Sequence, residues 1–236
     1  MIKEMEIPEI QKRFDGADAE EILGWALKEY HGRIAFATSL GLEDQVITEM
    51  LSRLDPGIKI FTLDTGRLFQ ETYDLLQVTQ KKYGMPVGVF FPEAARVEGM
   101  VREKGINLFY ESVENRQLCC HIRKIEPLKR ALTGCDAWIT GLRSEQSMTR
   151  RDIHAVEQDQ QNKILKINPL ANWSMDQVRD YIRDHNIPYN PLHDKGYPSI
   201  GCLPCTRAID PGEDIRAGRW WWEQPQYKEC GLHQKE

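Results

Sequence analysis

The chain has 236 residues, with 31 lysines and arginines against 36 aspartates and glutamates, for a formal net charge of -5. With 41% hydrophobic and 28% charged residues, its composition excludes a disordered chain, a coiled coil and a collagen-like repeat. The acidic balance makes the chain a poor candidate for a bulk nucleic-acid or membrane-surface binder. No stretch reaches the roughly 20 apolar residues of a membrane helix, and residues 1–10 show no signal peptide, so we expect a cytoplasmic protein.

Short apolar runs alternate with amphipathic segments through the first two-thirds of the chain. Five runs predict buried strands, at residues 34–37, 58–63, 87–91, 137–140 and 164–167. The apolar spacing predicts helices over residues 42–54, 67–83 and 121–132. Asp18 with Glu21 is typical of a helix start, and Ser174 with Gln177 indicates a capping box. We therefore expect an α/β fold with a doubly wound, mostly parallel five-stranded sheet.

Beyond about residue 186 the sequence becomes irregular. Six prolines between residues 188 and 225 break up regular structure, and three of the six cysteines lie in this part. We expect a single domain, with an α/β nucleotide-binding core over about residues 18–186 and a cysteine-containing C-terminal segment over about residues 187–236. That segment is expected to form an irregular lobe followed by a mobile tail.

Three turns at the carboxyl ends of the expected strands carry candidate ligand-binding residues, because ligands of such sheets bind at this edge. Ser39 and Gly41 lie in a turn that runs into a helix, where a phosphate can meet free backbone N–H groups. Residues 63–66, with the sequence LDTG, follow the second strand, and Gly141 follows the fourth. Three positive charges within nine residues suggest an anion cradle beside that glycine: Arg143, Arg150 and Arg151. Ordinary turns and a solvated loop are the alternatives.

Four cysteines form two close pairs, Cys119 with Cys120 and Cys202 with Cys205. This spacing is typical of a metal site. Adjacent cysteines suit an iron–sulfur cluster better than zinc, which normally uses two CxxC knuckles. Zinc, or buried cysteines with no ligand, are the alternatives.

The other two cysteines stand alone. Cys135 comes just before an expected strand, where a small buried hydrophobic residue is the better interpretation. Cys230 lies in a polar segment near the C-terminus, and is either a reactive nucleophile or an incidental thiol.

Taken in order, the motifs resemble those of the assimilatory adenylyl-sulfate reductases, the cluster-containing branch of the phosphoadenylyl-sulfate reductase family. They are SLGLED, LDTG, the tandem cysteines with Lys124 four residues after the second, TGLRSEQSMTR, GCLPC and ECGLH, and the resemblance spans about residues 33–233. Leu40 departs from the aromatic residue expected in the first motif. The resemblance implies an adenine-nucleotide α-hydrolase-like fold with strand order 3-2-1-4-5.

The resemblance also implies roles for individual residues. One 4Fe–4S cluster would be bound by Cys119, Cys120, Cys202 and Cys205. The substrate's phosphate would lie against Ser39 and Gly41, and its adenosine against Leu63, Gly66, Gly141 and Leu142. The phosphosulfate would be surrounded by Lys124, Arg216, Arg219, Arg150 or Arg151, and His233. The nucleophile would be Cys230.

The activity implied is the reduction of adenylyl sulfate to sulfite and AMP through an S-sulfocysteine on the enzyme, in sulfate assimilation and cysteine biosynthesis. Thioredoxin or a glutaredoxin-like protein would supply the thiols. The alternatives are a phosphoadenylyl-sulfate or dual-specificity reductase, an iron–sulfur redox sensor, and an ATP pyrophosphatase, whose SGGxDS turn is absent. We expect no nucleic-acid or membrane partner, and homo-oligomerisation is left open.

Overall fold

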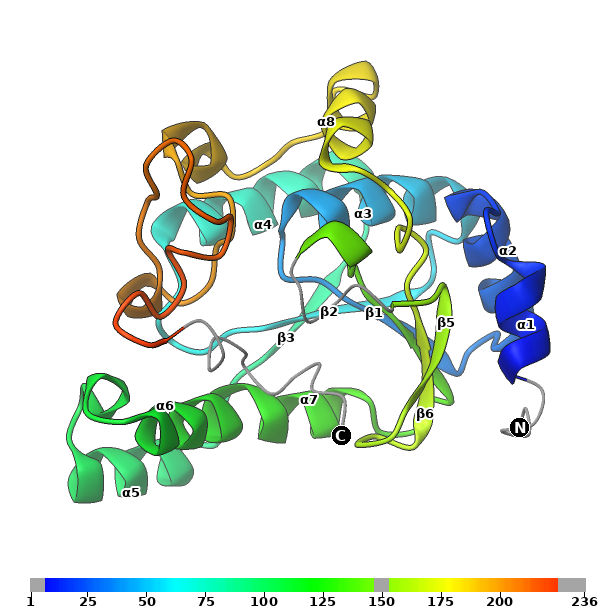
Figure 1. Ribbon diagram of the computed structural model, residues 1–236. Coiled ribbons are helices and arrows are strands. Elements are labelled where there is room, and N and C mark those ends of the chain that lie inside the picture. The colour runs from blue at the N-terminus through cyan, green and yellow to red at the C-terminus, as the bar shows by residue number, and fades with distance from the viewer. Residues whose placement is uncertain (1–6, 147–152, 225–236) are drawn as a thin grey trace. The chain divides into compact units, whose positions relative to one another are not determined.

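In the computed structural model, which describes residues 7–146 and 153–224, six strands form one sheet in the order β3-β2-β1-β4-β6-β5 (Figure 1). The strands are β1 (Ile34–Ala37), β2 (Lys59–Leu63), β3 (Val87–Phe90), β4 (Ala137–Ile139), β5 (Val156–Asp159) and β6 (Ile164–Ile167). β1 pairs in parallel with β2 and β4, and β4 pairs in parallel with β6. The five expected strands and their doubly wound order are confirmed, and the strand order reverses between β1 and β4.

The sixth strand, β5, was not expected. It pairs with β6 in antiparallel register, with Val156 opposite Ile167 and Asp159 opposite Ile164. The turn between them places Lys163 in the left-handed region, at φ 56°, and its N–H donates to the Asp159 carbonyl. A strand at the edge of a sheet needs no continuous apolar run. The polar sequence VEQD therefore did not predict this strand.

Eight α-helices lie in the described ranges. They are α1 (Ile7–Arg13), α2 (Ala19–Glu29), α3 (Leu42–Leu54), α4 (Gln70–Tyr83), α5 (Ala94–Lys104), α6 (Val113–Cys120), α7 (Glu126–Ala131) and α8 (Met175–Asp184). Asp18 caps α2, and Ser174 exchanges hydrogen bonds of 3.1 and 2.8 Å with Gln177 at the start of α8, so both expected caps are confirmed. Every helix of the described chain falls short of the length and apolarity needed to cross a bilayer.

The helix expected over residues 121–132 belongs to a longer helical run. It begins at α6, continues through a π-helical turn, His121–Ile125, and ends with α7. The Glu126 N–H bonds back to the His121 carbonyl, the five-residue spacing of a π-turn. Pro127, which has no N–H to donate, lies in the first turn of α7, directly after the π-turn.

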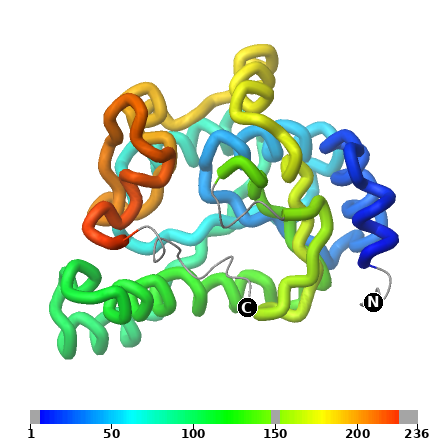
Figure 2. Tube along the Cα trace, viewed as in Figure 1, coloured from blue at the N-terminus to red at the C-terminus, as the bar shows by residue number. Residues whose placement is uncertain are grey.

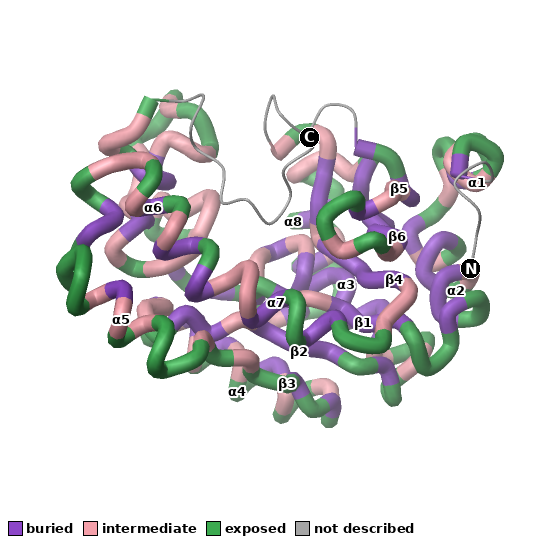
Figure 3. Tube along the Cα trace, turned by 90° about the horizontal axis from the view of Figure 1, so that it is seen from below, coloured by how far each residue is buried: buried purple, intermediate pink, exposed green. Residues whose placement is uncertain are grey.

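The chain divides into two compact units. The first comprises Met1–Thr62, Asp74–Gly88 and Gly134–Asn190, and the second comprises Leu63–Tyr73, Val89–Thr133 and Pro191–Glu236. In the first unit, α8 packs on α3 and α1 packs on β5 (Figure 1). Its strands β1 and β4 are almost entirely buried, as the purple stretches in Figure 3 show. They form one hydrophobic core with α2, α3 and α8.

The second unit has a smaller core of its own. Three cysteines lie in it beside Phe109 and Trp220. From Pro191 onward, the described chain is irregular apart from two short 3-10 turns, Pro191–Lys195 and Leu203–Cys205 (Figure 2). This irregular lobe is what the prolines predicted.

Candidate functional site

In the turn between β1 and α3, the hydrogen-bond donors expected for an anion are engaged within the chain. The Asp44 carboxylate accepts hydrogen bonds from the backbone N–H and the hydroxyl of Ser39, both at 2.6 Å. Leu40 is in the left-handed region at φ 61°, and its N–H donates to the Thr38 hydroxyl. The donors expected for a substrate phosphate therefore face a carboxylate of this chain.

Asp44 also fills the space beside the turn that follows β4. A Cβ added to Gly141 would lie 2.2 Å from Asp44 Oδ1, so only glycine allows this close approach. Burial raises the pKa of the Asp44 carboxyl to about 6, although the hydrogen bonds from Ser39 oppose the rise. The negative charge of Glu43 raises this pKa further. Asp44 is thus the titratable group that joins the turns after β1 and β4.

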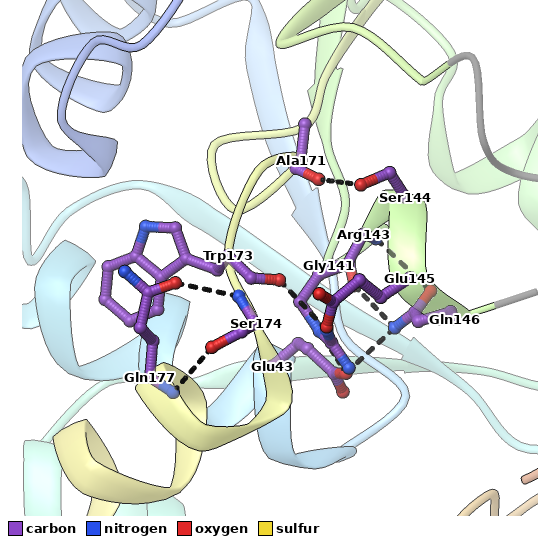
Figure 4. A network of polar contacts seen from close by, with 10 residues as sticks. All are labelled: Glu43, Gly141, Arg143, Ser144, Glu145, Gln146, Ala171, Trp173, Ser174 and Gln177. Carbon is purple, nitrogen blue, oxygen red and sulfur yellow. Dashed lines mark hydrogen bonds and ion pairs between the residues drawn. The ribbon is translucent and has the colours of Figure 1, made fainter.

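Arg143 is buried in the network shown in Figure 4. Its Nε donates to Glu43 Oε1 at 2.8 Å, and its Nη1 donates to the Trp173 carbonyl at 3.0 Å. The same Glu43 oxygen accepts from Gln146 at 2.9 Å. The side chain of Arg143 is 1% exposed. The expectation that Arg143 offers its charge to an anion is wrong, because Glu43 neutralises that charge inside the protein.

Other residues expected at this edge have different surroundings. Leu142 packs with Ile153 and Ala171 in a small buried cluster. Arg150 and Arg151 lie outside the described residues. Buried apolar packing accounts for Leu142 in this structure, and its expected role beside adenosine stays a prediction.

In the second unit, the LDTG turn contacts the cysteine-bearing segments. Asp64 accepts hydrogen bonds from the Gly66 N–H at 2.7 Å and from the Tyr73 hydroxyl at 3.0 Å. The Thr65 carbonyl accepts from Arg123, and the Thr65 hydroxyl lies 3.2 Å from the Cys202 sulfur. Gly66 has φ 72°, a conformation that favours glycine. Leu63, at the end of β2, is half-buried.

The structure brings both cysteine pairs into the same hydrophobic cluster. Cys119 and Cys120 end α6, while Cys202 and Cys205 bound a short 3-10 turn. Three of these cysteines are only 8–9% exposed: Cys119, Cys120 and Cys205. Cys202 packs against them. None of the cysteines that the structure describes forms a disulfide, so all four thiols are available as ligands.

Burial raises the pKa values of two of these thiols, Cys205 and Cys119, and neighbouring cysteines add to the rise. Burial raises the pKa of Cys205 to about 12, and the neighbouring Cys202 and Cys120 add to the rise. Lys124, in the π-turn, acts in the opposite direction on Cys205. Burial also raises the pKa of Cys119, against the positive charge of Arg123. Protonated, buried thiols of this kind are poor nucleophiles at neutral pH.

The segment that carries the expected arginines is attached to the CxxC turn. Arg219 pairs with Thr206 in an antiparallel bridge, and the Trp220 N–H donates to the Cys205 carbonyl at 3.2 Å. The guanidinium carbon of Arg219 lies 4.7 Å from the centre of the Trp220 ring. Arg216 is half-buried in the same segment. The expected nucleophile, Cys230, and His233 lie outside the described residues.

Several residues of this second unit escaped the sequence analysis. Thr65 and Arg123 contact the cysteine-bearing segments, and Asp64 orders the LDTG turn. Thr65 and Asp64 belong to a motif that was singled out, so their side chains could have been considered. Arg123 directly precedes Lys124, but only the fold shows that it turns toward Thr65.

Comparison with known proteins identifies the family. A sequence model of the phosphoadenosine phosphosulfate reductase domain matches residues 33–208. The chain belongs to the phosphoadenosine phosphosulfate reductase family. The adenosine 5'-phosphosulfate reductase of Allochromatium vinosum is 54% identical over 220 residues, 93% of this chain and 86% of the relative. That of Burkholderia cepacia is 49% identical over 226 residues, 96% of this chain and 89% of the relative.

Solved structures agree with the family. The crystal structure of a phosphoadenylyl-sulfate reductase from Candida auris, in a phosphate complex, has a TM-score of 0.76 and 29% identity, covering 89% of this chain and 98% of that one. FMN adenylyltransferase from Candida glabrata, at 13% identity and a TM-score of 0.58, shares the fold alone, covering 97% of this chain and 78% of that one. The resemblance seen in the motifs is confirmed, and this member of the reductase family is an oxidoreductase.

Proposed function

We propose that this reductase converts adenylyl sulfate into sulfite and AMP, with a thioredoxin-type dithiol protein as the reductant, in cytoplasmic sulfate assimilation and cysteine biosynthesis. The observation that carries the proposal is the gathering of two cysteine pairs beside the LDTG turn. The similarity to proteins named adenosine 5'-phosphosulfate reductases supports the same substrate, at 54% and 49% identity. The phosphoadenylyl-sulfate reductase of known structure is less similar, at 29%.

The four clustered thiols fit a 4Fe–4S cluster as the cofactor. No three histidine, cysteine, aspartate or glutamate side chains of the described chain converge as the ligands of one metal ion do. A 4Fe–4S cluster does not require its ligands to converge on one point, because each thiolate binds a different iron. The ligands would be Cys119, Cys120, Cys202 and Cys205, and the bound group would link the two pairs and fix the charge around them. The donor set contains sulfur alone, which suits iron–sulfur chemistry.

The chemistry proposed for the chain's own residues begins at Cys230. Its thiolate attacks the sulfur of adenylyl sulfate, the bond from sulfur to the phosphate oxygen breaks, and AMP leaves with that electron pair. A thiolate of the reductant then attacks the Cys230 sulfur and releases sulfite, leaving a mixed disulfide. The second thiol of the reductant resolves this disulfide, so the two electrons that reduce the substrate come from the dithiol.

Positive charge is needed wherever the phosphosulfate binds, since the leaving AMP carries additional negative charge. In the second unit, Lys124, Arg216 and Arg219 are proposed for this role, and His233, Arg150 and Arg151 join them on the basis of the motifs alone. In the first unit, Ser39 and Gly41 are proposed to receive phosphate. Adenosine is proposed to pack against Leu63, Gly66, Gly141 and Leu142.

The proposal is tested by measuring sulfite release with reduced thioredoxin, using adenylyl sulfate and its 3′-phosphorylated form side by side. We expect the higher kcat/KM for adenylyl sulfate. Without thioredoxin, the reaction should stop after one turnover, with the SO₃ group on the peptide that contains Cys230. Preference for the 3′-phosphorylated nucleotide, or an adduct on another cysteine, would overturn the corresponding part of the proposal.

A further inference from the structure

Arg116 and Glu223 form a buried ion pair in the second unit that no role described so far uses. Their side chains are 1% and 3% exposed. Arg116 Nε donates to Glu223 Oε1 at 3.0 Å, and Nη2 donates to Oε2 at 2.9 Å. This two-bond fork fixes the relative geometry of both side chains. An arginine keeps its charge in a protein, so its complete burial requires a partner such as Glu223.

The same guanidinium lies beside one of the proposed iron ligands. Arg116 precedes Cys120 by four residues on α6, which places both side chains on one helix face. Burial works to lower the pKa of Arg116, but Glu223 and Cys120 hold it above its usual value. Arg116 therefore places a buried positive charge on the helix face that carries Cys120.

The partner of Arg116 lies in the segment that leads to the proposed nucleophile. The guanidinium carbon of Arg116 is 4.8 Å from the centre of the Trp220 ring, a cation–π contact. The Trp220 N–H bonds to the Cys205 carbonyl, and the Glu223 N–H bonds to the Trp220 carbonyl at 2.8 Å. Residues 220–223 are thus tied both to α6 and to the CxxC turn. Cys230 follows Glu223 in the sequence by only seven residues.

We propose that Arg116 is a positioning residue that couples the cysteine cluster to the start of the segment bearing Cys230. Its positive charge on the same helix face stabilises the Cys120 thiolate as an iron ligand, and its fork to Glu223 fixes residues 220–223. This inference rests on the proposed function, because it takes Cys120 as a ligand and Cys230 as the nucleophile.

Two variants and a control separate this role from a merely structural one. Glu223→Gln removes the ionic fork but leaves Arg116 without a counter-charge, which can unfold the protein. Arg116→Met/Glu223→Met replaces the pair by apolar side chains of similar volume, an exchange that buried ion pairs often tolerate. The control is Glu213→Gln, which breaks the fork between Arg207 and Glu213 (2.9 and 3.0 Å) in the same C-terminal segment. Those side chains are 38% and 33% exposed.

Four readouts are taken on each purified holoenzyme: iron per chain, the affinity for AMP, the terminal Fe–S stretching frequency by resonance Raman, and the single-turnover rate of AMP release without thioredoxin. For the double variant we expect iron to be retained and AMP affinity to match the wild type. We expect AMP release to slow 10- to 100-fold. The Fe–S frequency should rise, since loss of the positive charge on the helix face of Cys120 lets its sulfur donate more strongly to iron. The control should match the wild type throughout.

A folded double variant with the wild-type rate and Fe–S frequency would overturn the proposal and leave the ion pair a structural feature. A folded double variant that has lost iron would also overturn it, because the ion pair would then be needed to bind the cluster rather than to position residues 220–223. If the double variant does not fold, the same readouts are taken on Glu223→Gln. Slow AMP release with iron retained would support the coupling, and a wild-type rate of AMP release would overturn it. Absence of iron, or of an S-sulfo adduct, in the wild type would instead count against the proposed function itself.

Discussion

Asp44 accepts both hydrogen bonds that Ser39 offers, one from its backbone N–H and one from its hydroxyl, each 2.6 Å long. Ser39 is proposed to receive the substrate's phosphate, so the carboxylate and a phosphate would compete for the same donors. The carboxylate is buried and its pKa is raised to about 6. Protonation of Asp44 therefore falls within an experimentally accessible range of pH, and its consequences can be measured.

Replacing Asp44 by asparagine should stabilise the protein at pH 8 and have little effect at pH 4.5. In the wild type, the folded-state pKa is about 6 against an ordinary value of 3.8, so the unfolded chain loses this proton first as pH rises. The free energy of unfolding then falls between about pH 4 and pH 6, by about 3 kcal/mol from this group. Asparagine avoids that cost but makes weaker, uncharged hydrogen bonds with Ser39, so the net gain is smaller.

Urea unfolding of both proteins across this range of pH measures the effect. The difference in unfolding free energy should grow as pH rises toward 6 and then stay constant. A difference that is the same at pH 4.5 and pH 8 would show that Asp44 does not titrate near pH 6.

Gly141→Ala should destabilise the protein through its contact with Asp44. The new Cβ would lie 2.2 Å from Asp44 Oδ1 and 3.1 Å from Glu43 Cβ. Asp44 is short, buried and held by Ser39, so it cannot swing away cheaply. We expect a loss of about 1–3 kcal/mol, as for overpacking elsewhere.

A double-mutant cycle with Asp44→Ala tests the cause. In the Asp44→Ala background, the cost of Gly141→Ala should shrink by about 1 kcal/mol or more, because the crowded oxygen is gone. Gly99→Ala is the matched control: a Cβ there meets no atom within 4 Å, and alanine in helix α5 should add about 0.5–1 kcal/mol. Additive costs in the cycle would contradict the predicted clash.

Arg143→Met should destabilise the first unit strongly. The change leaves Glu43, whose side chain is 13% exposed, without its cationic partner. Removal of one partner from a buried pair costs about 3–5 kcal/mol. Glu145→Gln is the control, since Glu145 contacts Arg143 at 3.4 Å with a side chain that is 59% exposed, and should change stability by less than about 0.5 kcal/mol. If thermal unfolding shows equal shifts for the two variants, Arg143 is not the buried anchor described above.

The fold was largely predictable because buried parallel strands carry continuous apolar runs. Val156–Asp159 escaped because an edge strand can be polar. Arg143 was misread for a different reason: a cluster of positive charge in sequence does not show which charge is already paired. Its partner, Glu43, lies in a separate motif, and only the fold brings the two together.

The candidate site was predictable where chemistry fixes the residue type. Two cysteine pairs stand out because few other functions need that spacing. The ion pair between Arg116 and Glu223 could not be found in this way, since arginine and glutamate are common surface residues. Neither residue belongs to a recognised motif, and their burial is visible only in the folded chain.

Cys205→Ser should lose iron, whereas Cys135→Ser should keep it. Cys205 lies in the hydrophobic cluster with Cys119 and Cys120, and the charges of Cys202 and Cys120 act on its pKa. Serine is a poor ligand for iron in such a cluster.

Cys135 has other surroundings. It is half-buried in the first unit, where burial raises its pKa against the charge of Lys59. After anaerobic purification, iron and acid-labile sulfide should each be about four per chain in the wild type and in Cys135→Ser, and near zero in Cys205→Ser. Circular dichroism checks that both variants are folded. Iron retained in Cys205→Ser, or lost in Cys135→Ser, would show that the ligand set has been assigned to the wrong cysteines.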